Sequence, residues 1–306
     1  MKKIFIKVPF SEEQQKRLES ISEDLEFVYK EDKSANVIIG NIAPACLKEF
    51  KNLEWIQTAA VGVDKYIKEG VLPEGVILTN AVDVHTKEVS EHTLAVILMM
   101  IKKLHLYRND QIEHKWCDEG KVKEISKLKI CIVGLGNIGK HLAKLLKGLG
   151  IYVIGVKRNI EEKPDFVDEL YSNKQLKTAI SDVDVVVTIL PGNKANVHLF
   201  DLETFQAMRK DAILINVGRG NLFSEEVMKK VLEEKIIAGI AADVFENEPL
   251  DPKNKLWDYP NLLITPHAAG SYHLESAFEA LFELVEENLR HYVNNEELKY
   301  IVKERD

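Results

Sequence analysis

Hydrophobic residues recur along the chain in short runs that are apolar on both faces and rich in β-branched side chains. Such runs, when they alternate with longer amphipathic stretches, indicate parallel strands covered by helices on both sides. The runs predicted to be strands are KIFIKV, LEFVY, NVIIG, WIQTA, GVILT, KICIVG, IYVIGV, DVVVTIL, AILINVG, IIAGIAA and NLLITP.

The stretches between these runs are predicted to be helices, chiefly residues 11–21, 87–107, 137–149 and 224–234. The pattern indicates an α/β chain with two parallel sheets, the first ending near His85 and the second running from the helix at Lys87 to the loop at Pro266. The last helix, from Ser271 to about Tyr292, is followed by no strand and is expected to pack back on the first domain. The predicted domains are residues 1–85 with 270–306, and residues 86–269.

Composition and charge exclude some classes of protein. The chain has 306 residues, 45% of them hydrophobic, which allows sizeable cores. Its formal charge is −8 with both signs interspersed, so nucleic acid is not expected as the main partner. The longest apolar run, Leu94 to Ile101, is too short to span a membrane. A lysine interrupts the short apolar stretch in MKKIFIKVPF, so no signal peptide is expected there.

The three cysteines, Cys46, Cys117 and Cys131, are scattered without CxxC spacing. They indicate neither a disulfide framework nor a zinc site. Together with the absence of a membrane or secretion signal, they predict a soluble protein of a reducing compartment, the cytoplasm.

A glycine-rich turn follows the strand KICIV, where Gly134, Gly136 and Gly139 fit the pattern GxGxxG. The first glycine permits a tight turn, the second lets a pyrophosphate approach the backbone, and the third allows close packing of helix on strand. The N–H groups at the start of the next helix, at Asn137 and Ile138, would face the phosphates. GxGxxG alone is a weak signal, but here a strand precedes it and a helix and second strand follow, which favours dinucleotide binding over a structural turn.

The second strand of this unit ends in Lys157, Arg158 and Asn159, where a dinucleotide-binding protein usually has an acid for the ribose. No acid occurs until Glu161. The pair of cations is either surface charge on a loop or a site for the extra phosphate of NADP. The second interpretation is preferred, and NADPH is predicted to be used in preference to NADH.

Three later strands end in polar loops that carry Arg219, Glu248 and His267. The carboxyl ends of parallel strands share one edge of the sheet, so these residues are expected on a common rim with the glycine turn. Arg219 can grip a carboxylate with a planar fork, and His267 can exchange a proton near neutral pH. Glu248 could bond the other imidazole nitrogen, fix the tautomer and favour the charged ring. Each residue could alternatively be an ordinary loop residue, but the ordered set favours a site that interconverts 2-oxo and 2-hydroxy acids.

In these motifs and their order, the chain resembles the D-isomer-specific 2-hydroxyacid dehydrogenases. The resemblance is carried by VSEHTLAVIL, VGLGNIG, INVGRG, DVFENEPL and LWDYPNLLITPHAAG, with a looser match at TAAVGVDKY. It implies a Rossmann-type doubly wound domain, a second flavodoxin-like α/β substrate domain that is split in sequence, and a homodimer formed through the nucleotide-binding domain. The apolar helix near Leu94 to Ile101 suits that dimer contact, or simple core packing.

The resemblance also implies roles for individual residues. Arg219 would bind and polarise the substrate, His267 would be the acid/base and Glu248 its partner. Backbone N–H groups of Ala60, Val61 and Gly62 would hold the substrate carboxylate. Asp243 would contact the nicotinamide carboxamide, although a buried acid at a strand end can also simply cap a turn. His85 and Tyr272 are further candidates for the pocket lining, or packed loop residues.

Two departures and two rival functions accompany the resemblance. LPGNKANVHLF replaces the usual threonine-bearing loop, and VKRN replaces the usual acid, as in the NADP-preferring glyoxylate/hydroxypyruvate reductases. The principal rival is a dinucleotide-sensing, corepressor-like binding module with little turnover. Formate dehydrogenase fits less well, because that branch typically has glutamine where Glu248 stands.

Overall fold

The computed structural model describes residues 1–160 and 162–303. The chain divides into two compact units, of which one comprises Met1–His85 with Tyr272–Asp306 and the other Thr86–Ser271. Each unit is built on its own parallel sheet, and the chain passes between the units at His85–Thr86 and at Ser271–Tyr272.

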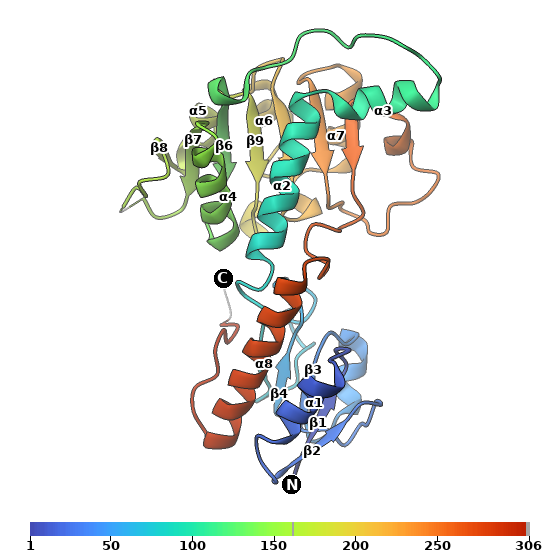
Figure 1. Cartoon of the computed structure of the whole chain (residues 1–306), viewed down its shortest axis with the longest axis vertical. Coiled ribbons are helices and arrows are strands. Elements are labelled where there is room, and N and C mark those ends of the chain that lie inside the picture. Colours follow the sequence, from blue (N-terminus) through green and yellow to red (C-terminus); the bar gives the residue numbers. More distant parts are fainter. Residues whose placement is uncertain (161, 304–306) are drawn as a thin grey trace. The chain divides into compact units, whose positions relative to one another are not determined.

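The unit Thr86–Ser271 contains a seven-stranded parallel sheet in the order β12-β11-β10-β9-β6-β7-β8. The order reverses between β6 and β9, which is the doubly wound arrangement that leaves a crevice at the carboxyl ends of the strands. Figure 1 shows these strands side by side. Their bounds are β6 Lys129–Val133, β7 Tyr152–Lys157, β8 Glu169–Ser172, β9 Val185–Thr188, β10 Ile213–Asn216, β11 Gly239–Ala242 and β12 Leu262–Ile264.

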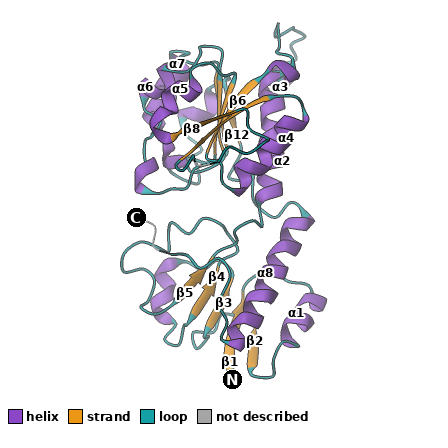
Figure 2. Cartoon of the chain, turned by 90° about the vertical axis from the view of Figure 1, so that its left-hand side faces the viewer, coloured by secondary structure: helices purple, strands orange, loops and turns teal. Residues whose placement is uncertain are grey.

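Helices cover both faces of this sheet (Figure 2). One core lies between the sheet and α2 and α4, and a second lies between the sheet and α5, α6 and α7. Because both faces are covered, the central strands β6, β9, β10 and β11 are almost continuously apolar and buried. The helices are α2 Thr86–Ile101, α3 Leu104–Ile112, α4 Asn137–Gly148, α5 Leu176–Ile180, α6 Leu202–Gln206 and α7 Glu225–Glu233, with short 3-10 turns η2 Ile125–Lys127, η3 Asn173–Gln175, η4 Lys194–Asn196, η5 Gly220–Leu222 and η6 Lys255–Asp258.

The other unit contains a five-stranded parallel sheet in the flavodoxin-like order β2-β1-β3-β4-β5. Helices α1 (Glu12–Glu19) and α8 (Glu275–Asn294) cover one face, and the 3-10 turn η1 (Pro44–Glu49) packs on the other. The last helix therefore returns to the first sheet, where Leu281, Phe282 and Val285 are fully buried. The strands are β1 Lys2–Ile6, β2 Leu25–Val28, β3 Val37–Ile39, β4 Trp55–Gln57 and β5 Ile77–Thr79.

The structure differs from the sequence prediction in several elements. The last helix, predicted from Ser271 to about Tyr292, spans Glu275–Asn294. The predicted helix 87–107 is two helices, because Lys103 adopts a left-handed conformation (φ 58°) that ends α2 and starts α3. Strand β8 was not predicted, and it is an edge strand that is only partly buried, so its sequence ELYS lacks an apolar run. Within the described residues, no helix combines the length and hydrophobicity that crossing a membrane requires.

Candidate active site

The three glycines of the turn after β6 each meet a different requirement. A Cβ atom on Gly134, whose φ is +111°, would lie 2.4 Å from the carbonyl oxygen of Ile189. A Cβ atom on Gly139 would lie 2.2 Å from the carbonyl oxygen of Gly134, so the third glycine lets α4 pack directly on the turn. A Cβ atom on Gly136, the N-cap of α4, would meet nothing within 4 Å. That open side, beside the N–H groups at the start of α4, is where a pyrophosphate group would fit.

Lys157, the last residue of β7, and the following Arg158 and Asn159 stand next to this turn in the sheet order. Lys157 is half-buried, and Arg158 and Asn159 are exposed. Within the described parts of the chain, neither cation forms a side-chain hydrogen bond or ion pair. Both are therefore able to accept an anionic group from solution, and no carboxylate of the described chain competes for them.

Arg219 follows β10 and stands between Gly218 and Gly220. Each of these glycines packs closely against the backbone of a neighbouring loop. A Cβ atom on Gly218 would lie 2.6 Å from the amide nitrogen of Leu190, and one on Gly220 would lie 1.9 Å from the carbonyl carbon of Phe245. Side chains cannot be accommodated at either position, so the loop that carries Arg219 is pressed between the ends of β9 and β11. Two further bonds hold it: the Asn216 side chain donates to the Arg219 carbonyl oxygen (3.0 Å) and accepts from the Gly218 N–H (3.1 Å).

Glu248 and His267 are in direct contact. Glu248 Oε2 lies 2.7 Å from His267 Nδ1, and Glu248 Oε1 accepts a hydrogen bond of 2.9 Å from the Phe245 N–H. Phe245 is also the residue against which Gly220 packs, so the Arg219 loop and the Glu248–His267 pair share one support. The side chain of His267 is half-exposed, and its Nε2 makes no hydrogen bond to any residue that the structure describes.

The backbone of His267 adopts a left-handed conformation (φ 53°), which is uncommon for a residue other than glycine. Asp243, at the end of β11, holds it there. The Asp243 carbonyl oxygen accepts from the His267 N–H (2.7 Å), and its carboxylate accepts from the Ala268 N–H (2.8 Å) and the Ala269 N–H (3.1 Å). A strained backbone at a candidate active site is a recognised sign of function when its surroundings enforce it.

Asp243 itself is almost fully buried, and Thr265 donates a hydrogen bond of 2.5 Å to its Oδ1. His92 of α2 lies behind this pair, with Nε2 3.4 Å from Thr265 Oγ1 and 4.0 Å from Asp243 Oδ1. The turn-capping role that a strand-end acid can have is therefore present at Asp243, and its contact with a nicotinamide carboxamide stays a prediction. Sequence reasoning did not identify His92 or Thr265, although Thr265 directly precedes the Pro266–His267 motif.

The loop Ala60–Gly62 lies in the five-stranded unit, after β4. Its backbone N–H groups donate to no acceptor among the described residues. Its carbonyl groups, in contrast, are bound: Ala60 O accepts from the Thr58 hydroxyl (2.8 Å) and Val61 O accepts from Asn80 Nδ2 (2.7 Å). N–H groups without an internal acceptor are able to donate hydrogen bonds to an anion such as a carboxylate. Asn80, which follows β5, was missed from sequence because a polar residue after a strand is common in any α/β fold.

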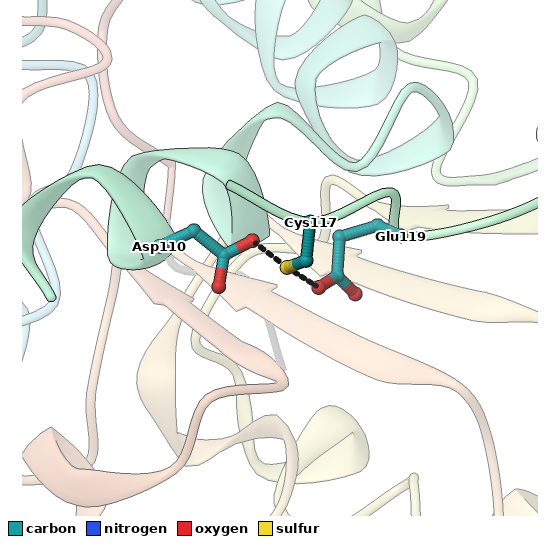
Figure 3. A group of neighbouring side chains, drawn as sticks. All are labelled: Asp110, Cys117 and Glu119. Carbon is teal, nitrogen blue, oxygen red and sulfur yellow. Dashed lines mark hydrogen bonds between the residues drawn. The ribbon is translucent and has the colours of Figure 1, made fainter. Parts of the chain in front are cut away.

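One cluster of potential metal ligands lies outside these regions. Figure 3 shows Asp110, Cys117 and Glu119 beside one another. Their potential ligand atoms lie within 4.8 Å of one another. The Cys117 thiol donates to Asp110 Oδ2 over 3.0 Å, and this carboxylate raises the pKa of Cys117 to about 11. The thiol therefore stays protonated at neutral pH, which explains the contacts without a metal ion. The three cysteines are free thiols.

Comparison with known proteins relates this geometry to a large family. Residues 94–269 match the family described as D-isomer specific 2-hydroxyacid dehydrogenase, NAD binding domain. The chain is 30% identical to a D-lactate dehydrogenase of Streptococcus agalactiae over 270 residues, covering 82% of this chain and 80% of the relative. It is also 30% identical to a glyoxylate reductase of Pyrococcus horikoshii over 279 residues, with 86% and 81% covered.

Solved structures agree with these relatives. An NADPH-dependent glyoxylate/hydroxypyruvate reductase from Sinorhizobium meliloti, in complex with NADP and sulfate, is similar with a TM-score of 0.84 and 25% sequence identity, covering 99% of this chain and 98% of that one. A D-isomer specific 2-hydroxyacid dehydrogenase family protein from Aeromonas salmonicida is similar with a TM-score of 0.86 and 25% identity, covering 99% of both chains.

Proposed function

Since the chain belongs to the D-isomer specific 2-hydroxyacid dehydrogenase family of NAD(P)-dependent oxidoreductases, we propose that it reduces a small 2-oxo acid to the D-2-hydroxy acid, with NADPH as the preferred reductant. Glyoxylate, hydroxypyruvate and pyruvate represent the substrate class. The observation that carries the proposal is the 2.7 Å contact between Glu248 and His267 Nδ1, which leaves Nε2 able to serve a substrate.

Each of the proposed site residues has a separate role in the reduction of the 2-oxo acid. A nicotinamide cofactor, when bound, supplies the hydride that C2 of the substrate accepts. His267 donates a proton from Nε2 to the carbonyl oxygen of the substrate, while Glu248 holds Nδ1 and orients the ring. Arg219 grips the carboxylate and carbonyl oxygens with its planar fork, and the N–H groups of Ala60–Gly62 hold the carboxylate. In the oxidative direction, His267 takes the proton back from the hydroxyl group.

The preference for NADPH is supported by the two cations after β7. A ribose acid would accept hydrogen bonds from the 2′-hydroxyl of NADH and would repel a 2′-phosphate. Lys157 and Arg158 form no ion pair with the described residues, so an incoming phosphate need not displace an internal partner. The similar reductase from Sinorhizobium meliloti is NADPH-dependent.

We also propose a homodimer formed through the seven-stranded unit. The apolar face of α2 is used internally, because Val96, Ile97, Met100 and Ile101 pack in the core of their own unit. Exposed apolar side chains instead occur on and after α3, where Leu104 is 52%, Ile112 61% and Trp116 104% exposed. Exposed aromatic and aliphatic residues in one segment are typical of subunit contacts. Light scattering should give twice the chain mass for the wild type and a smaller mass for Trp116→Glu, and a monomeric wild type would exclude the dimer.

A cytoplasmic location is part of the same proposal. It is supported by Cys46, Cys117 and Cys131, which are all free thiols, as is usual for proteins of a reducing compartment.

Steady-state assays test the proposed reaction. Glyoxylate, hydroxypyruvate and pyruvate should each be assayed with NADPH and with NADH, and the enantiomer formed from hydroxypyruvate identified by chiral chromatography. We expect turnover with at least one acid, a higher kcat/KM with NADPH, and the D product. Tight binding of NADPH without turnover of any acid would instead support a dinucleotide-sensing binding module.

A further inference from the structure

Two aromatic side chains contact the carbonyl oxygen of Ala59. The Tyr272 hydroxyl donates a hydrogen bond to this oxygen, and His85 Nε2 lies 3.4 Å from it. The two rings also contact each other edge to face, with centroids 4.4 Å apart. Tyr272 is 213 positions from Ala59 in sequence, so this contact joins segments that are distant along the chain.

Tyr272 and His85 occupy a special place in the chain. His85 is the last residue of the first segment of the five-stranded unit, and Tyr272 is the first residue of its second segment. His85 is buried with 5% exposure, and Tyr272 adopts a left-handed backbone conformation (φ 60°). A bulky residue rarely takes that conformation unless its surroundings enforce it, and here the ring also packs edge to face on Phe278 of α8.

Because the peptide bond is planar, these contacts also set the direction of the adjacent N–H groups. In a trans peptide, the C=O of one residue and the N–H of the next lie in one plane and point in opposite directions. Fixing the Ala59 oxygen therefore aims the Ala60 N–H, and fixing the oxygens of Ala60 and Val61 aims the N–H groups of Val61 and Gly62. The second plane is held by the Thr58 hydroxyl and the Ala81 N–H, and the third by Asn80.

We propose that Tyr272 and His85 are positioning residues for the carboxylate-binding loop, acting through the carbonyl oxygen of Ala59. The first of the three peptide planes, between Ala59 and Ala60, is held by the side chains of His85 and Tyr272. These two residues are the points where the chain leaves the unit and enters it again. The inference rests on the proposed function, in that it takes the ligand of Ala60–Gly62 to be the carboxylate of a small 2-oxo acid. Tyr272 then helps to set the affinity for the acid without touching it.

The variant Tyr272→Phe tests the proposal, because it removes the hydroxyl group and keeps the ring that packs on His85 and Phe278. We expect the KM for glyoxylate to rise about threefold to tenfold, the range that one neutral hydrogen bond supports. We expect kcat and the dissociation constant for NADPH to stay within about twofold of the wild type, since neither depends on this loop's grip on the carboxylate. The dissociation constant for oxalate, a non-reducible dicarboxylate, should rise together with the KM.

Tyr292→Phe is the matched control. The Tyr292 hydroxyl donates to Glu54 Oε2 over 2.6 Å in the same unit, so its loss removes a comparable hydrogen bond away from the loop. It should leave the KM for glyoxylate unchanged. If Tyr272→Phe does not fold, as judged by thermal unfolding, His85→Phe provides a second variant, for which a KM increase of about twofold is expected from the weaker contact.

Three outcomes would overturn the positioning role: an unchanged KM and oxalate affinity in Tyr272→Phe, an equal loss of kcat and NADPH affinity, or the same increase in Tyr292→Phe. If the wild type reduces no 2-oxo acid, the proposed function fails, but calorimetric titration with oxalate still tests the loop. Oxalate that binds the wild type more tightly than Tyr272→Phe supports the positioning role, and oxalate that does not bind the wild type refutes it.

Discussion

The residues proposed to bind ligands are of opposite kinds in the two units. In the seven-stranded unit, the residues proposed for the chemistry are charged side chains at strand ends, namely Lys157, Arg158, Arg219, Glu248 and His267. In the five-stranded unit, the proposed carboxylate site consists of the backbone N–H groups of Ala60–Gly62. Polar side chains nearby donate hydrogen bonds to the carbonyl oxygens of the same peptide groups.

This difference has an energetic basis. A charged side chain brings its full charge to a ligand, but it is flexible and must be oriented by neighbours, as Glu248 orients His267. Backbone N–H groups carry only partial charges, but their direction is set once the peptide planes are held. Substitutions in the seven-stranded unit should therefore change the rate or the choice of cofactor strongly. Substitutions around the Ala60–Gly62 loop should change the affinity for the acid modestly.

The largest effect is expected for His267→Asn. Asparagine tolerates the left-handed backbone of this position but cannot exchange the proton, so kcat should fall by roughly 10²–10⁴-fold with little change in NADPH binding. Stopped-flow single turnovers and fluorescence titration with NADPH would measure the two quantities. His198→Asn is the control, since His198 also has a positive φ and pairs with a carboxylate, Glu246, at 3.1 Å. An active His267→Asn enzyme would remove this histidine from the mechanism.

Arg219→Lys should have the next largest effect. The variant keeps the positive charge but loses the planar two-point grip, and kcat/KM for the 2-oxo acid should fall by about tenfold to a hundredfold. Arg209→Lys, which alters an exposed arginine that forks onto Asp211 in the same unit, should behave like the wild type. Equal kinetics of the two lysine variants would place Arg219 outside the substrate site.

Arg158→Ala should reduce the preference for NADPH over NADH by about tenfold, because one charge-assisted contact to the 2′-phosphate is lost. Solvent screening of this exposed side chain keeps the loss at the lower end of the range for such a contact. NADH serves as the internal control, since it lacks the phosphate and its dissociation constant should stay constant. Fluorescence titration gives both constants independently of turnover. If both cofactors weaken alike, or the wild type prefers NADH, then these cations are surface charge.

Asn80→Ala should have the smallest effect of the series. The variant frees the Val61 carbonyl group and lets one peptide plane of the loop reorient, so the KM for the 2-oxo acid should rise about twofold to fivefold. The rate constant kcat and NADPH binding should not respond. A large fall in kcat in this variant would contradict the contrast between the two units, because it would mean that the loop acts on the chemical step.

Local patterns were sufficient to predict much of this molecule. The strands apolar on both faces, from Ile4 to Ile264, were recognisable because a parallel sheet between helices requires apolar residues on each side. The first and third glycines of GLGNIG were recognisable because a tight turn packed against a helix has no room for a side chain there, as Gly134 and Gly139 show. Edge strand β8 and the break at Lys103 were not predicted, since neither changes the hydrophobic periodicity.

The sequence by itself determined the α/β class, the order of the elements and which ionisable residues stand at strand ends, because these depend on spacing along the chain. The pairing of Glu248 with His267 was expected from the sequence, and the tertiary structure has it at 2.7 Å. Only the tertiary structure decided that His92 meets Thr265 and Asp243, and that Tyr272 meets Ala59. These partners lie from 19 to 213 positions apart. Hydrogen bonds depend on distance and direction in space, and no local pattern of hydrophobic and polar residues records either quantity across such separations.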